Sequence, residues 1–172
     1  EHSSVVDGVL WARKIEVLIY FHFTTMEAHE DDGEMFVYTG GDQVVPNDVR
    51  RVRIDKSVKI IPQRAFYGRG YLIYVEFHDG IEEIGKWAFQ YCYSLRSVKL
   101  LGVKIIETRA FESCVDLIDV EFDKLETIEQ WAFNYCRSLR SLTIPSVRSI
   151  DRGAFNNCVQ ITDLEFGEHW RQ

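Results

Sequence analysis

Residues 87–97 read WAFQYCYSLRS, and residues 131–141 repeat this phrase almost letter for letter as WAFNYCRSLRS. A weaker copy begins midway between the two, at Ala110-Phe111. A fixed spacing of this kind is the sequence signature of a repeat architecture. The underlying unit is therefore about 22 residues long, and the two near-identical copies belong to alternate units.

The Ala-Phe pair marks five units at nearly constant spacing, namely Ala65-Phe66, Ala88-Phe89, Ala110-Phe111, Ala132-Phe133 and Ala154-Phe155. At fixed offsets after each Phe, two apolar side chains flank one other residue, as in Val120-Glu121-Phe122. This alternation indicates a short strand with its middle residue facing solvent. One unit is too small to bury its own apolar face, so units must stack into a continuous column. The pattern predicts an α/β repeat fold: a right-handed leucine-rich repeat solenoid with a short parallel β-sheet over residues 49–172.

The repeat also resembles a known family. The form A-F-x-x-C-x-x-L-x-x-V-x-I-P-x-x-V-x-x-I, over about residues 49–166, resembles the BspA-type (Treponema-type) leucine-rich repeat, and one unit matches it at Ala132, Phe133, Cys136, Leu139, Leu142, Ile144, Pro145, Val147 and Ile150. Two departures are clear: only this unit has Ile-Pro, and Arg69 stands where Cys is expected. The resemblance implies a surface-displayed or regulatory binding scaffold and brings no catalytic residues with it.

The two ends are read differently. Residues 1–48 are predicted to form an N-terminal capping segment, in which Trp11, Ile15 and Phe36 cover the first coil. Alternation from Ile15 to Phe23 fits a strand, with a helix as the rival, and Met35–Tyr38 fits a short strand. The five residues after the last strand, 168–172, are too few to shield the sheet edge. Three alternatives follow: a longer array, a Trp170 that folds back, or end-to-end self-association through this uncapped edge.

Composition narrows the classes of partner. The formal net charge is −7 and the pI about 5.2. This balance argues against a general nucleic-acid binder, which needs a basic face, and against adhesion to anionic membranes. The longest apolar candidate, Val17–Phe23, is far shorter than a bilayer-spanning helix, so no membrane insertion is expected. The sequence leaves the compartment open.

The exposed strand positions are the first candidates for partner binding. They are Tyr74, Glu76, Ser97, Lys99, Asp119, Glu121, Ser141, Thr143, Asp163 and Glu165. Acidic strands alternate with strands that carry Lys or Thr, so the chemical period is two units. One interpretation is electrostatic, because carboxylates stacked in register repel. The other is a binding surface for a partner with basic groups, and the two are compatible.

Trp87 and Trp131 are further candidates, because both stand directly before Ala-Phe in alternate units. They are expected either to pack on the convex side of the solenoid or to form an aromatic contact surface. The preferred function is a non-enzymatic scaffold that binds a protein partner, or a glycan. A structural or adhesive cell-surface spacer is the alternative, and a polysaccharide-acting enzyme, with Glu121 and Glu165 as its carboxylate pair, is remote.

The four cysteines, Cys92, Cys114, Cys136 and Cys158, occupy the same position in successive units. The favoured interpretation is a column of small buried side chains. Disulfides between adjacent coils are an alternative, since stacked repeats bring Cα atoms within bonding range. A metal site is not expected, because the chain has no C-x-x-C and no His at ligand spacing. No catalytic, cofactor-binding or metal-binding residue is assigned.

Overall fold

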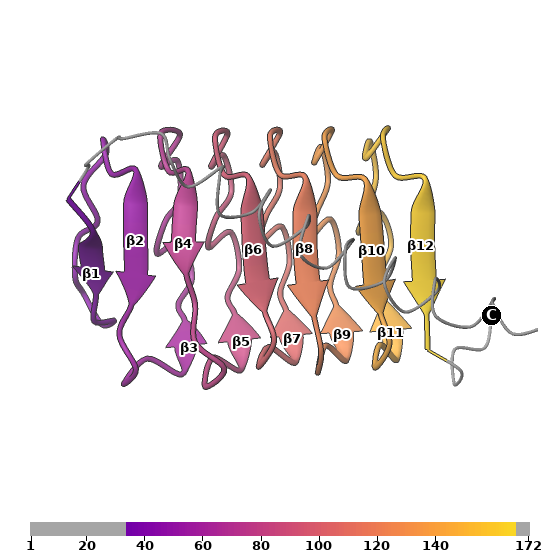
Figure 1. Ribbon diagram of the computed structural model, residues 1–172, viewed down its shortest axis with the longest axis horizontal. Helices are drawn as coiled ribbons and strands as arrows, with labels where there is room; N and C mark the ends of the chain where they lie inside the picture. Colours follow the sequence, from indigo (N-terminus) through magenta and orange to yellow (C-terminus); the bar gives the residue numbers. More distant parts are fainter. Residues whose placement is uncertain (1–33, 168–172) are drawn as a thin grey trace, which may run out of the picture. The chain divides into compact units, whose positions relative to one another are not determined.

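The computed structural model describes residues 34–167, which form a parallel β-solenoid of about five turns (Figure 1). A seven-stranded parallel sheet has the order β1-β2-β4-β6-β8-β10-β12, and a five-stranded parallel sheet has the order β11-β9-β7-β5-β3. The strands of the first sheet are β1 (Phe36–Tyr38), β2 (Arg51–Ile54), β4 (Tyr74–Glu76), β6 (Ser97–Leu100), β8 (Asp119–Phe122), β10 (Ser141–Ile144) and β12 (Asp163–Phe166). Those of the second are β3 (Ile60–Ile61), β5 (Glu83–Ile84), β7 (Ile105–Ile106), β9 (Thr127–Ile128) and β11 (Ser149–Ile150).

The pairing register follows the repeat frame. Val98 pairs with Val120 and Leu142 with Leu164, each partner lying one repeat unit further along the chain. The inward residues of β6, β8 and β10 are buried and the residues between them are exposed. The predicted parallel sheet is therefore confirmed. The second sheet was not predicted; each of its strands has only two residues.

The predicted α/β class is not confirmed, because residues 34–167 contain no helix. Turns join each short strand to the next long one. In these turns some N–H groups donate to the third preceding carbonyl, as from Ala110 to Glu107, and others donate to the next coil, as from Phe111 to Ala132. An α-helix needs every N–H for its own fourth preceding carbonyl, so coil-to-coil bonding and helix formation exclude each other here. The right-handed winding remains a prediction.

Left-handed backbone conformation also prevents a helix in the turns. In every unit the residue before Ala-Phe and the second residue after Phe have positive φ, between 56° and 70°. The first set is Arg64, Trp87, Arg109, Trp131 and Gly153, and the second is Gly68, Tyr91, Ser113, Tyr135 and Asn157. Positive φ is comfortable for Gly and tolerated by Asn, and it is strained for other side chains. Most of these ten positions hold neither Gly nor Asn. Stacking of the coils therefore overrides the local backbone preference of the residues there.

A column of phenylalanines runs through the core. The rings of Phe66, Phe89, Phe111, Phe133 and Phe155 stack with centroids 4.8, 5.1, 5.2 and 5.5 Å apart, and no two neighbours are tilted by more than 8°. Tyr38 closes the column at the β1 end, edge-on to Phe66 at 4.9 Å. The Ala-Phe pair of the repeat thus supplies the continuous element that each coil adds to the next.

The cysteines form a second column, as expected. Cys92, Cys114 and Cys136 are fully buried, Cys158 is partly exposed, and all four are free thiols. Each Sγ donates to the carbonyl of the Phe in the preceding unit, at 3.0 to 3.2 Å. Arg69, which replaces Cys in the first unit, donates its Nε to the carbonyl of Val45 at 2.9 Å. It therefore makes the same kind of bond back to the preceding coil.

A polar ladder follows the phenylalanine column one residue along the chain. Glu112 accepts hydrogen bonds from Gln90 at one carboxylate oxygen and from Asn134 at the other, the latter at 2.7 Å. Asn134 in turn accepts from Asn156 at 3.3 Å and from Asn157 at 3.4 Å. Gln90 and Asn134 are buried, and the Glu112 side chain is only 12% exposed. One carboxylate thus holds the amides of the units on either side.

Several expectations fall outside the described residues. The capping role of Trp11 and Ile15, the strand or helix at Ile15–Phe23 and the position of Trp170 all lie in residues 1–33 or 168–172. Within the described part, β1 confirms the strand expected at Met35–Tyr38 and pairs with β2 in parallel. The boundary between residues 48 and 49 remains a prediction. In residues 34–167 there is no helix long and apolar enough to cross a bilayer.

Candidate interaction face

Two rows of side chains point outward from the seven-stranded sheet; strand pairing joins the first row throughout and joins the second row within β2–β4, β6–β8 and β10–β12. The first row is Arg51, Tyr74, Ser97, Asp119, Ser141 and Asp163. The second row is Arg53, Glu76, Lys99, Glu121, Thr143 and Glu165. The structure thus brings together the ten predicted strand residues. Arg51 and Arg53 were not among the predicted candidates. The signal was available, because Val52 and Ile54, which alternate with them, fit the repeat frame.

Most charges of the second row are paired along the sheet. Arg53 Nε lies 2.8 Å from Glu76 Oε2, and Lys99 Nζ lies 3.2 Å from Glu121 Oε1. Thr143 Oγ1 lies 3.5 Å from Glu165 Oε2. These contacts agree with the electrostatic interpretation of the alternating strands. The carboxylates of Glu76 and Glu121 remain about half exposed.

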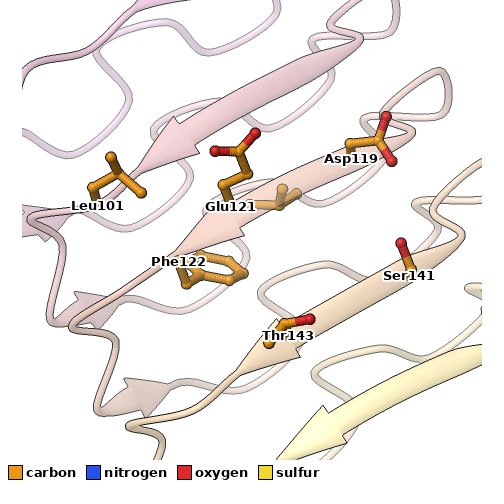
Figure 2. Close-up of a pocket in the computed structure, with 7 residues that line it drawn as sticks. Leu101, Asp119, Glu121, Phe122, Ser141 and Thr143 are labelled. Atoms are coloured by element: carbon orange, nitrogen blue, oxygen red, sulfur yellow. The ribbon is translucent and has the colours of Figure 1, made fainter. Parts of the chain in front are cut away.

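A shallow hollow of about 370 Å³ lies over β8 (Figure 2). Its lining comprises Leu101, Asp119, Val120, Glu121, Phe122, Ser141 and Thr143. β6 and β8 pair over four residues, whereas β8 and β10 pair only at Asp119 and Ser141. At the end of β8, where this pairing has stopped, the Phe122 ring packs edge-on against the Phe133 ring of the next unit, with the centroids 6.2 Å apart.

The same interruption recurs between β4 and β6, which pair only at Tyr74 and Ser97. Here Phe77 leans on Phe89 at 5.8 Å, as Phe122 leans on Phe133. By contrast, β6 and β10 each pair with the next strand over four residues, and they carry Leu100 and Ile144 at this position. Extended pairing therefore groups the strands as β1-β2-β4, β6-β8 and β10-β12, and the last two groups follow each other at the two-unit period of the sequence.

Charge is unevenly distributed across the face. At one side β2 carries Arg51 and Arg53, both exposed. At the other side β8 carries Asp119 and Glu121, and β12 carries Asp163 and Glu165. The intervening strands β4, β6 and β10 carry one charge or none at their outward positions. One side of the face is thus basic and the other acidic.

Trp87 and Trp131 lie in the turns and not in the sheet, so the structure separates them from the strand candidates. The guanidinium of Arg64 lies 4.9 Å from the Trp87 ring, and that of Arg109 lies 4.5 Å from the Trp131 ring. On its other side Trp131 covers Gly153, where an added Cβ would fall 2.6 Å from the indole. Both indoles are half-buried by these neighbours, so packing accounts for much of their surface.

The five-stranded sheet carries a charge ladder that sequence analysis missed. Directly before its strands stand Lys59, Glu82, Lys104, Glu126 and Arg148, alternating in sign. Lys104 pairs with Glu82 at 2.9 Å, which holds the pKa of that carboxyl below its usual range, and Arg148 pairs with Glu126 at 3.8 Å. The regular spacing of these residues, one per unit, was the available signal. They form a solvated ladder beside a hollow of about 260 Å³.

No group of three or more His, Cys, Asp or Glu side chains within residues 34–167 is placed to hold a metal ion. The cysteine column differs along its length. Burial raises the pKa of the Cys92 thiol to about 12, and burial likewise raises the pKa values of Cys114 and Cys136. Cys158 is only partly buried, and its Sγ donates to the carbonyl of Phe133.

This difference predicts selective alkylation. In the native protein iodoacetamide should modify Cys158 roughly 100-fold faster than the other three thiols, because only Cys158 is partly exposed and the others are buried. Peptide mass mapping over a time course measures the four rates. Equal labelling of Cys114 would contradict the prediction, and Cys158→Ser is the matched control.

Comparison with known proteins agrees with the repeat geometry. The family model described as the BspA type leucine rich repeat region matches residues 47–171 in six copies. This chain belongs to that family. No curated protein matches it. The solved structure of a leucine rich repeat protein from Treponema pallidum is 27% identical, with a TM-score of 0.66 over 78% of this chain and 64% of that one.

Two further solved structures share the fold at lower identity. A leucine-rich repeat protein from Bacteroides ovatus is 22% identical, with a TM-score of 0.52, over 76% of this chain and 30% of that one. A leucine rich cell surface protein from Faecalibacterium prausnitzii is also 22% identical, with a TM-score of 0.52, over 81% of this chain and 52% of that one. This BspA-type chain therefore spans less than two thirds of each of these solved chains.

Proposed function

We propose that this BspA-type chain is a non-enzymatic scaffold that binds a protein partner through the exposed face of its seven-stranded sheet. The observation that carries the proposal is the pair of outward rows on β2 to β12, which presents polar and charged side chains in fixed register. The hollow over β8 adds apolar surface from Leu101 and Phe122 to this polar setting. A partner with basic groups suits the acidic strands β8 and β12, because opposite charge steers encounter and sets orientation.

A peptide array with basic, neutral and acidic members tests this function. Basic peptides should bind, and binding should weaken with salt. Neutralising four acids together by Asp119→Asn, Glu121→Gln, Asp163→Asn and Glu165→Gln should lower the affinity for those peptides about 30-fold, at ~0.5 kcal/mol for each exposed charge. Glu82→Gln with Glu126→Gln, on the five-stranded sheet, is the control and should leave binding unchanged. Preference for acidic peptides would overturn the proposal.

A surface spacer is the second candidate, and one observation favours it. Arg53 with Glu76 and Lys99 with Glu121 already satisfy each other within the face, which leaves less charge for a partner. A spacer should bind neither the peptides nor the members of a glycan array, and the fourfold variant should then behave as the parent protein does. Selective glycan binding would instead move the partner from protein to carbohydrate.

A further inference from the structure

The charges in the two outward rows of the sheet face are self-complementary. Consider a second copy laid face to face, related by a two-fold axis parallel to the strands and passing between β6 and β8. This operation places β2 opposite β12, β4 opposite β10 and β6 opposite β8, and it keeps each row opposite the same row. The facing pairs become Arg51 with Asp163, Arg53 with Glu165, Lys99 with Glu121, Ser97 with Asp119, Glu76 with Thr143, and Tyr74 with Ser141.

No like charges meet in this arrangement. Three of the facing pairs join a cation to a carboxylate, two join a carboxylate to a hydroxyl, and one joins two hydroxyls. By two-fold symmetry each pair occurs twice. We propose that the partner of the sheet face is a second copy of this chain, docked in this orientation. The inference rests on the proposed function, since it uses the same face and names the occupant.

Charge also selects this orientation over the other symmetric one. A two-fold axis running across the strands would lay β2 on β2 and β12 on β12. Arg51 would then face Arg53, and Asp163 would face Glu165, so both sides of the face would repel. Relief of repulsion within one sheet explains why Lys99 stands beside Glu121. Relief of repulsion within one sheet does not explain why β2 carries two arginines and β12 carries two carboxylates. These two strands lie opposite each other in the docked pair.

The size of the face predicts a weak, reversible contact. Six strands spaced ~4.8 Å apart span about 24 Å, and four residues along a strand cover about 13 Å. Twice the resulting area is well below the total that a typical stable interface buries, about 1600 Å². Charged pairs at the rim contribute mainly to orientation and encounter rate. Self-association should therefore depend strongly on ionic strength.

Sedimentation velocity of the full chain tests the proposal. At about 0.02 M salt the protein should dimerise with rising concentration, and at about 0.5 M the dimer should weaken at least tenfold. The double variants Arg51→Glu with Arg53→Glu, and Asp163→Lys with Glu165→Lys, should each dimerise about 100-fold more weakly because like charges then face each other. An equimolar mixture of the two variants should recover dimers, since each supplies the complement that the other lacks.

The control is Lys56→Glu with Lys86→Glu, which changes net charge as the first variant does but lies off the face; it should dimerise as the parent does. A parent protein that stays monomeric at low salt, a mixture that fails to recover, or a control that weakens equally would overturn self-pairing. Binding of each sample to the basic peptides separates the two proposals. Peptide binding without self-association means that the face serves a different partner, whereas loss of both overturns the proposed function as well.

Discussion

Phe111→Ala should destabilise the solenoid by about 3–5 kcal/mol. The ring is fully buried and stacked on both sides, 5.1 Å from Phe89 and 5.2 Å from Phe133. Its loss removes apolar contact and opens a cavity in the middle of the column. In a solenoid each unit is stabilised mainly by its neighbours, so a break at the centre weakens the coupling between the two halves as well.

Urea unfolding followed by circular dichroism measures this effect, and Phe155→Ala is the matched control. Phe155 is only partly buried and has one stacked neighbour in the column, Phe133 at 5.5 Å. Its replacement should cost less than half as much as that of Phe111. We also expect the Phe111 variant to unfold over a broader range of urea concentration, as coupling between coils is reduced. Equal losses in the two variants would show that stacking along the column contributes little.

The inward residues were predictable because each buried side chain stacks on the equivalent side chain of the next unit. The Phe, Cys and Leu positions recur once in every unit, and a side chain that stacks on its own copy must stay apolar and similar in size. The short strands of the second sheet gave a weaker signal, because only the last residue of each one recurs as an apolar residue in every unit, at Ile61, Ile84, Ile106, Ile128 and Ile150. A two-residue strand such as β5 shows one inward Ile and no alternation, and its existence depends on coil-to-coil hydrogen bonds that only the folded chain forms.

The predicted α/β class was not confirmed, for a reason that the sequence partly displays. Gly153, Gly68 and Asn157 occupy the positions of positive φ, and they are the residues that prefer it. The other units place Trp, Arg, Tyr or Ser there, which hides the signal. The hollow over β8 was also beyond sequence reasoning, because it depends on how the side chains of neighbouring strands pack. The ten strand candidates lie at outward strand positions, whereas Trp87 and Trp131 lie in turns, and the role of all twelve in binding remains a prediction.

Glu112→Leu should have the second large effect, a loss of about 3 kcal/mol. Leucine fills the space without accepting hydrogen bonds, so the buried amides of Gln90 and Asn134 each lose their acceptor. An unsatisfied buried donor costs about 1–3 kcal/mol. Urea unfolding again provides the measurement. Glu76→Leu on the exposed face is the matched control and should change stability by less than about 1 kcal/mol. An effect at Glu112 no larger than that would mean that solvent reaches both amides.

Glu112→Gln separates the loss of acceptors from the loss of shape. Asn134 cannot turn its amide around, because its oxygen already accepts from Asn156 and Asn157. It must keep its nitrogen toward position 112, so the new glutamine has to turn its oxygen to Asn134 and its nitrogen to Gln90. Gln90 can then flip its own amide and accept that bond. The amide ladder is then restored with one direction reversed, and the remaining loss of about 1 kcal/mol comes from the ion pair between Arg109 and Glu112, whose atoms lie 3.7 Å apart. The double variant Glu112→Gln with Gln90→Leu removes the residue that flips. Its loss should exceed the sum of the two single losses, because the glutamine nitrogen is left without an acceptor.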